Sequence, residues 1–70
     1  MKFGNLVRIL EDHRFELARQ RGSHCTYKGQ VGGQVRVVVV AYHRDSADIK
    51  PGTLSSMIRQ SGLPKELFRR

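Results

Sequence analysis

The sequence predicts an α+β fold with the element order α-β-β-β-α, in which two helices cover one face of a three-stranded antiparallel sheet. Three observations support this. An amphipathic helical repeat opens the chain, three strand-like segments separated by glycine turns follow, and a second helical repeat begins at Lys50-Pro51-Gly52-Thr53. Strands joined by short turns form hairpins, and an antiparallel sheet can leave one face in water. The chain has 70 residues, so we expect one domain over residues 1–70.

The first helix is expected to end near residues 12–14. Along this helix apolar side chains recur at helical spacing, and polar side chains fall largely on the other side. The apolar positions are Phe3, Leu6, Val7 and Leu10, with Ile9 beside them. This stripe predicts packing against the core rather than a ligand site.

The first strand is predicted over residues 15–20. Strict alternation places Phe15 and Leu17 on one face. The same alternation groups three residues on the opposite face: Glu16, Ala18 and Gln20. Arg21-Gly22 then forms a tight turn, because glycine adopts the positive φ that such a turn requires.

The second strand, residues 23–28, carries the chemistry of the chain. Its alternation directs Cys25 and Tyr27, with Ser23, toward the helices. The other face holds three polar side chains: His24, Thr26 and Lys28. This strand face therefore presents an imidazole and an ammonium group in line.

Residues 29–34 contain three glycines and are expected to form a flexible hairpin loop. The third strand, residues 35–42, includes a four-valine run that fits a central or doubly covered strand. Arg36, near its start, is expected at the open face or the edge.

Residues 43–50 are polar and are predicted to form a loop before the second helix. Pro51 fits the first turn of that helix, and Gly62 stands where a C-terminal glycine cap belongs. The stripe Leu54, Met57 and Ile58 follows helical spacing. A short last turn over residues 65–68 is expected to pack back through Leu67 and Phe68.

The charge balance points to a polyanion or an acidic protein as partner. Thirteen Lys and Arg residues face six Asp and Glu residues, for a net charge of +7. The single cysteine, Cys25, excludes an internal disulfide and has no zinc-ligand spacing, so neither a metal site nor a cofactor is predicted. No segment resembles a membrane span or a signal peptide, so a cytoplasmic location is expected.

His24 is the first candidate catalytic residue, because histidine moves protons near neutral pH. This strand alone, however, favours an exposed surface histidine in a hairpin. Lys28 could hold a phosphate, but a solvated lysine at a hairpin end is about as consistent with the pattern. Arg21, Arg36 and Lys50 are weaker candidates for phosphate contact. Gly22 and Ser23 would let the backbone of a polyanion approach, although Ser23 could simply close the turn.

Two other histidines are set apart from His24. His43 could be a second acid/base, but its place in a loop favours a structural role through hydrogen bonding. His13 lies at a helix end, where it can meet the helix dipole, and it is assigned no function.

Several short segments follow one another in a recognisable order: Gly22-Ser23-His24, His43, Lys50-Pro51-Gly52-Thr53-Leu54, Ile58 and Ser61-Gly62-Leu63. Together they resemble the HicA toxins, small mRNA interferases of type II toxin–antitoxin pairs. The α-β-β-β-α layout is also that of double-stranded-RNA-binding domains, which read shape and phosphates. Two positions depart from the family pattern: Arg14 replaces a frequent glycine, and Ala41 replaces a proline.

The resemblance implies metal-independent cleavage of mRNA with a single catalytic histidine, which falls on His24. It also implies a HicB-type antitoxin as the protein partner, with DNA contacted only indirectly through that antitoxin. Two other functions stay open from the residues alone. The same fold could bind duplex RNA without chemistry, or its basic face could dock an acidic protein.

Overall fold

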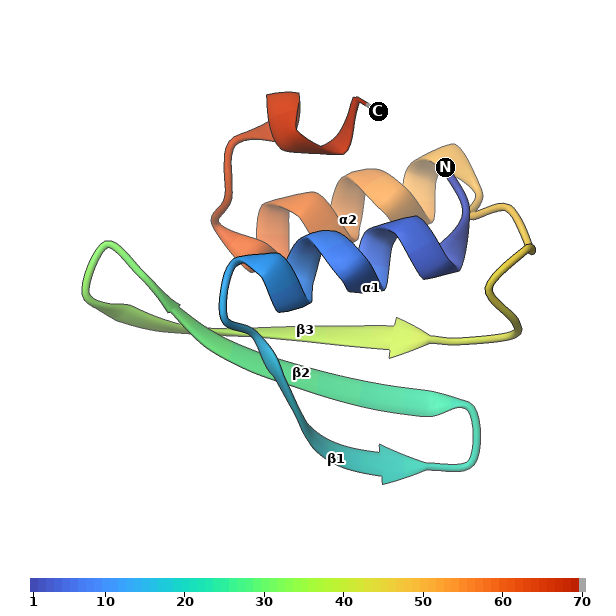
Figure 1. Cartoon of the computed structure of the whole chain (residues 1–70), viewed down its shortest axis with the longest axis horizontal. Coiled ribbons are helices and arrows are strands. Elements are labelled where there is room, and N and C mark those ends of the chain that lie inside the picture. The colour runs from blue at the N-terminus through green and yellow to red at the C-terminus, as the bar shows by residue number, and fades with distance from the viewer. Residues whose placement is uncertain (70) are drawn as a thin grey trace.

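The computed structural model describes residues 1–69 and has the predicted element order. The elements are α1 (Phe3–Asp12), β1 (Glu16–Arg21), β2 (His24–Val31), β3 (Gln34–Ala41), α2 (Pro51–Ser61) and the 3₁₀ turn η1 (Lys65–Phe68). The strands form one antiparallel sheet in the order β1-β2-β3, with α1 and α2 side by side above it (Figure 1). The predicted α-β-β-β-α fold is confirmed, and it is compatible with a double-stranded-RNA-binding-domain-like fold.

The core lies between the helices and the covered face of β2 and β3. Its fully buried members include Leu6, Val38 and Val40, and Phe15 is nearly as buried. Cys25 and Tyr27 are buried as predicted, and burial raises the pKa of the Tyr27 phenol. The opposite face of the sheet, here called the open face, has no helix over it.

The prediction of a flexible loop over residues 29–34 is wrong. The β2–β3 ladder continues to the pair Val31–Gln34, and only Gly32 and Gly33 form the turn. Both glycines have positive φ, 59° and 78°, as a common two-residue hairpin turn requires. Gly29 is instead a strand residue. A Cβ atom there would lie 2.8 Å from the ring of Phe15, so glycine lets that ring lie against the sheet.

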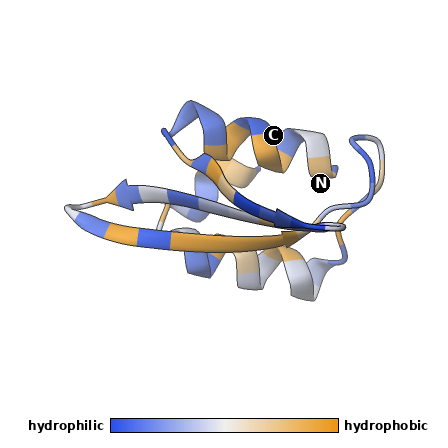
Figure 2. Cartoon of the chain, turned by 90° about the horizontal axis from the view of Figure 1, so that it is seen from below, coloured by the Kyte–Doolittle hydropathy of each residue, from blue (hydrophilic) through white to orange (hydrophobic). Residues whose placement is uncertain are grey.

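The expectation that the valine run forms a central or doubly covered strand is also wrong. β3 is an edge strand beside β2, and Figure 2 shows it as a long, largely hydrophobic strand. Val38 and Val40 enter the core, whereas Val35, Val37 and Val39 are exposed on the open face. The hydrophobic run therefore supplies the core with alternate residues only.

Helix α2 covers the outer edge of β3. The Val39 N–H donates to Gln60 Oε1 at 3.4 Å, which gives an edge amide a partner. The Arg36 guanidinium donates to the carbonyl oxygens of Arg59 at 2.9 Å and Gln60 at 3.1 Å. Of the two predicted locations for Arg36, the structure selects the edge. These contacts protect a strand edge that could otherwise pair with another chain.

A β-bulge interrupts β1, so the side chains after it lie on the opposite face of the sheet from the one predicted. The register shifts between Leu17, which pairs with Tyr27, and Arg19, which pairs with Thr26, so that Ala18 is the extra residue. Beyond the bulge, Gln20 pairs with Cys25 and lies toward the covered side. The predicted grouping of Gln20 with Glu16 and Ala18 is therefore wrong.

Both helices end in a left-handed residue. Gly62 follows α2 with φ 70°, as predicted for a glycine cap. Arg14 follows α1 with φ 66°, the only non-glycine residue with positive φ among residues 1–69. The N–H groups of Arg14 and Phe15 donate to the carbonyls of Glu11 at 3.0 Å and Leu10 at 2.9 Å. This is the Schellman pattern, so a left-handed turn forms although arginine stands at its key position.

The segment between β3 and α2 is held against the start of α1. The N–H groups of Phe3 and Gly4 donate to the carbonyls of Ala47 at 3.0 Å and Asp45 at 3.1 Å. The Tyr42 hydroxyl bonds the Asp45 carboxylate. These bonds cap the helix with backbone atoms and order the connection. None of the helices within residues 1–69 has the length and apolar character needed to cross a membrane.

Candidate nucleic-acid interface

His24 stands at the end of the sheet where two tight connections meet. It is the first residue of β2, exposed on the open face, with Arg21 and Ala41 as its cross-strand partners. Gly22 has φ 57° in the preceding turn, and the Ser23 carbonyl accepts the Tyr42 N–H at 2.7 Å. The backbone around His24 is therefore fixed. No hydrogen bond among residues 1–69 engages its imidazole, which leaves the ring available to a ligand.

One side of His24 opens into a hollow that we call the arginine hollow. It has a volume of about 200 Å³ and is lined by Arg19, Arg21, His24 and Thr26. The bulge at Ala18 creates it, because without the extra residue Arg19 and Arg21 would face the covered side. A guanidinium presents parallel N–H donors that match phosphate oxygens. The arginine hollow can therefore hold a phosphate beside an imidazole.

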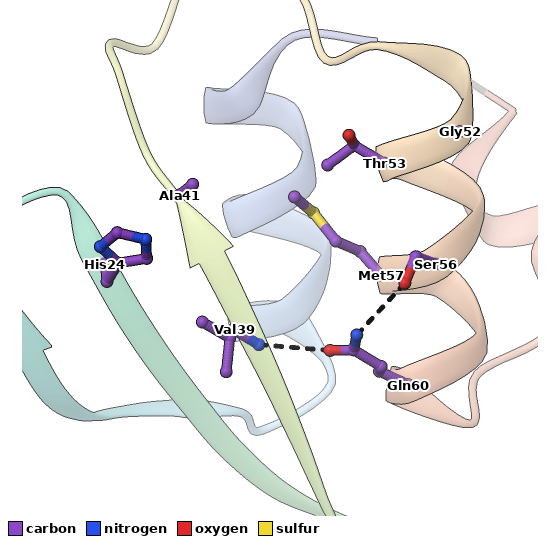
Figure 3. Close-up of a pocket in the computed structure, with 8 residues that line it drawn as sticks. All are labelled: His24, Val39, Ala41, Gly52, Thr53, Ser56, Met57 and Gln60. Carbon is purple, nitrogen blue, oxygen red and sulfur yellow. Dashed lines mark hydrogen bonds between the residues drawn. The ribbon is translucent and has the colours of Figure 1, made fainter.

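The other side of His24 opens toward α2, in a depression that we call the α2 groove. Its volume is about 350 Å³, and it crosses the outer part of β3 with His24 on one rim and α2 on the other (Figure 3). Its lining residues are His24, Val39, Ala41, Gly52, Thr53, Ser56, Met57 and Gln60. Ala41 lies opposite His24 on the neighbouring strand, and its single methyl group leaves the imidazole open to the groove.

The amide of Gln60 has a defined orientation in this groove. The Val39 N–H can only donate, so the oxygen of the amide must face it, at 3.4 Å. The amide nitrogen then donates to Ser56 Oγ at 3.3 Å (Figure 3). One amide hydrogen and the Ser56 hydroxyl hydrogen have no partner in this pair of bonds, so both can be donated to a ligand.

The structure brings some of the predicted site residues together with His24. Arg21 is its cross-strand neighbour, so the turn predicted at Arg21-Gly22 is one residue out: Gly22 and Ser23 form the exposed turn beside His24. Lys28 shares the open face, four residues along β2, which corresponds to about 13 Å for a strand. Lys28 can therefore contact a flanking phosphate rather than the one at His24.

Lys50 lies beyond the other end of the α2 groove. It is the N-cap residue of α2 and lines a separate hollow of about 240 Å³ together with His43. That hollow shares Ala41 and Thr53 with the α2 groove, so the two are neighbours. Lys50 is thus placed to contact the continuation of a nucleic-acid strand that enters the α2 groove.

Arg36 is not brought to the site. Its cross-strand partner is Gly29, and its guanidinium bonds the carbonyls at the C-terminal end of α2. These contacts give Arg36 a structural role in fastening α2 to β3. We leave Arg36 out of the candidate interface.

The other two histidines, His43 and His13, make contacts within the fold. The ring of His43 packs edge-on against Phe3, with 5.7 Å between ring centroids and an interplanar angle of 74°. Its structural contact is therefore aromatic packing rather than the expected hydrogen bonding. His13 Nδ1 lies 2.8 Å from the Ile9 carbonyl at the end of α1, where a positive charge would meet the helix dipole favourably.

Charge on the open face is predominantly positive. The residues of β1 and β2 that face this side include three cations, Arg19, Arg21 and Lys28, and one acid, Glu16. The ion pair between Lys2 and Asp48, at 3.3 Å, lies elsewhere. Among residues 1–69 no cluster of three or more histidine, cysteine or acidic side chains is suited to hold a metal ion.

Sequence reasoning missed Arg19 and the polar face of α2. A signal for Arg19 was present: with Phe15 and Leu17 directed inward, strict alternation would also direct Arg19 and Arg21 inward. Charged side chains are rarely buried without partners, so this conflict indicates a bulge. No comparable signal marks Ser56 and Gln60, because their proximity to His24 arises only from the packing of α2 on β3.

Comparison with protein families gives one match. A family model described as "HicA toxin of bacterial toxin-antitoxin" matches residues 4–63. This range includes His24, the bulge, the Gly22–Ser23 turn and all of α2. Comparisons with curated proteins and with solved structures give no match.

Proposed function

Because the chain belongs to the HicA toxin family, we propose that it is a metal-independent endoribonuclease that cleaves mRNA, with His24 as the principal acid/base. The family makes it the toxin of a toxin–antitoxin system. The observation that carries the catalytic proposal is the position of His24. Its imidazole is exposed on the open face, between a hollow lined by arginines and a groove lined by α2.

The proposed reaction is an internal transesterification of RNA. The ribose 2′-oxygen loses its proton and attacks phosphorus, and the bond from phosphorus to the 5′-oxygen breaks. The 5′-oxygen takes up a proton, so the products are a 2′,3′-cyclic phosphate and a 5′-hydroxyl end. His24 takes the first proton or delivers the last, and water completes the other transfer.

Arg21 and Arg19 supply the electrostatic part of the proposal. The attack adds negative charge to the phosphoryl oxygens, and donors aimed at these oxygens lower the barrier. Arg21 is the cross-strand neighbour of His24, and Arg19 lines the same hollow. Lys28 and Lys50 extend the positive surface on either side and are proposed to contact flanking phosphates.

The family implies an antitoxin partner. We propose that this partner is a HicB-type protein that covers the open face and so blocks His24. The positive charge of that face and its exposed valines, Val35, Val37 and Val39, suit an acidic protein surface with apolar residues. DNA is then reached only through the antitoxin.

The test is RNA cleavage by His24→Ala. We expect cleavage to fall by about 10²–10⁴-fold, the usual contribution of general acid–base catalysis. Circular dichroism should show an unchanged fold, because the side chain is exposed. His43→Ala is the matched control and should keep most activity, since its ring packs on Phe3. Full activity of His24→Ala would refute the assignment.

A second function is favoured by the same open face. A basic surface on an α-β-β-β-α fold could bind duplex RNA without cleaving it. In that case the wild-type protein would show salt-sensitive RNA binding that His24→Ala retains. Neither protein would yield cyclic-phosphate ends.

A further inference from the structure

We propose that the α2 groove is a nucleobase site, which holds the base of a nucleotide whose phosphate occupies the arginine hollow. This inference rests on the proposed function, because it concerns how the same RNA strand lies at His24. Its basis is that one imidazole lines two hollows of different chemical character. The arginine hollow suits an anion, whereas the α2 groove suits an uncharged flat group.

The walls of the α2 groove fit a base better than a phosphate. Val39 and Ala41 line it from β3, and Met57 reaches toward β3 from α2 (Figure 3). None of the arginines and lysines within residues 1–69 lines it. Enzymes that act on an unstacked base commonly hold it in a pocket between aromatic or apolar side chains. A volume of about 350 Å³ lies within the range of pockets that hold small ligands.

The polar edge of the groove can tell one base from another. Gln60 is oriented by the Val39 N–H, and its amide nitrogen bonds Ser56 Oγ. The remaining amide hydrogen, the Ser56 hydroxyl hydrogen and the Thr53 hydroxyl can reach the edge of a base. Groups held in place by other bonds read a ligand more sharply than mobile groups, because less freedom is lost on binding.

The placement also suits the geometry of a nucleotide. The ribose lies between the base and the phosphate, and His24 lies between the α2 groove and the arginine hollow. A base in the groove would therefore bring its ribose to the imidazole. Binding of the base would align the 2′-oxygen for attack and set the position of the cleaved bond.

Binding can be measured without cleavage. We suggest titrating the ¹⁵N-labelled protein with four dinucleotides that differ in the 5′ base and carry a 2′-deoxyribose at that position, which blocks transesterification. We expect the largest amide shifts at Val39, Thr53, Ser56 and Gln60, and affinities that differ between the four bases. Equal affinities, or shifts confined to Arg19 and Arg21, would overturn the proposal.

Two serines of α2 provide a matched pair of variants. Ser56 lines the α2 groove, whereas the adjacent Ser55 lines a different hollow on the other side of the helix. Ser56→Ala should change the order of affinities and weaken the preferred dinucleotide by about tenfold, the equivalent of one hydrogen bond. Ser55→Ala should leave both unchanged. The same effect from both variants, or from neither, would contradict a base site.

Cleavage mapping separates this inference from the proposed function. Sequencing of the 5′-hydroxyl ends should show that Ser56→Ala shifts the choice of cleavage sites while Ser55→Ala does not. If the wild-type protein cleaves and Ser56→Ala leaves its sites unchanged, the nuclease proposal stands and the base site fails. If the protein does not cleave, the dinucleotide titration still decides on the base site.

Discussion

The two edge strands of the sheet, β1 and β3, have opposite construction. All six residues of β1 are exposed, and β1 is held in the sheet by its pairing with β2. β3 sends Val38 and Val40 into the core, and α2 covers its outer edge through Arg36 and Gln60. β1 therefore presents charged side chains to solvent, whereas β3 contributes to the core and binds α2.

If the proposed function is correct, this difference separates the residues needed for RNA cleavage from those needed for stability along the sheet. Changes on β1 should alter RNA cleavage and leave the free energy of unfolding nearly constant, because its side chains bury little surface. Changes at the contacts of β3 with α2 should do the reverse. His24 lies on the strand between them and depends on both, with Arg21 on one side and Ala41 on the other.

The largest effect is expected for Arg21→Ala on β1. In the proposed mechanism Arg21 is a donor to the reacting phosphate, so its loss should lower the cleavage rate by about 10²-fold. Arg19→Ala should have a smaller effect in the same direction. Thermal unfolding should be unchanged for both. Arg8→Ala removes the same charge from the exposed surface of α1 and serves as the control. If Arg8→Ala slows cleavage equally, the effect is one of net charge, and β1 has no special role.

Gly29→Ala tests how β1 is anchored. A Cβ atom at Gly29 would lie 2.8 Å from the ring of Phe15, the buried residue immediately before β1. Displacement of this ring should lower the free energy of unfolding by about 1–3 kcal/mol. Cleavage should also fall, because Arg19 and Arg21 follow the displaced segment.

The control is Gly52→Ala, since a Cβ atom at Gly52 meets nothing within 4 Å and the residue is helical. It should be neutral or slightly stabilising in chemical denaturation. Equal destabilisation by both variants would mean that the contact between Phe15 and Gly29 is not what fixes β1.

Arg36→Met tests the opposite edge. The variant keeps an unbranched side chain but loses two hydrogen bonds to the carbonyls of Arg59 and Gln60. We expect it to lower the free energy of unfolding by about 1 kcal/mol, because these bonds are partly exposed to solvent. Cleavage by the folded protein should be retained.

Lys28→Met makes the same change on the open face of β2 and should shift stability by less than about 0.5 kcal/mol. An Arg36→Met protein that is fully stable but inactive would reverse the division between the two edges. It would return Arg36 to the candidate interface.

The fold could be predicted because its periodic signals are strong. The helical stripes of α1 and α2 and the alternation of Cys25 and Tyr27 gave the correct elements and the correct covered face. The errors arose where one local feature had two physical explanations. Glycine marks a flexible loop but also marks a place where a ring meets the sheet, as at Gly29. A valine run fits a covered strand, but on an edge strand half of it stays exposed.

The candidate site was predictable only in part. His24 and Lys28 share a face that follows from strand alternation. Arg19 and Arg21 join them because of a bulge, which changes the face of the following residues without any turn residue to mark it. Gln60 reaches the site because α2 crosses the edge of β3, and such tertiary contacts leave no local pattern in the sequence.

The smallest expected effect concerns the turn that leads from α1 into β1. Arg14 adopts φ 66°, a conformation that costs an L-residue about 1–2 kcal/mol and costs glycine much less. Part of the gain from Arg14→Gly is offset because glycine has more freedom in the unfolded chain. We therefore expect a net stabilisation of about 0.5–1 kcal/mol in chemical denaturation, with unchanged cleavage.

The matched control for Arg14→Gly is Arg8→Gly, which places the same substitution inside α1. It should destabilise by about 1 kcal/mol, because a helix interior disfavours glycine. Opposite signs for one substitution at two arginines would show that backbone conformation, not lost charge, decides the outcome. If Arg14→Gly also destabilised the protein, the left-handed turn would owe its stability to the arginine side chain. The Arg14 side chain would then help to hold the segment between α1 and β1, in addition to the Schellman hydrogen bonds and the packing of Phe15.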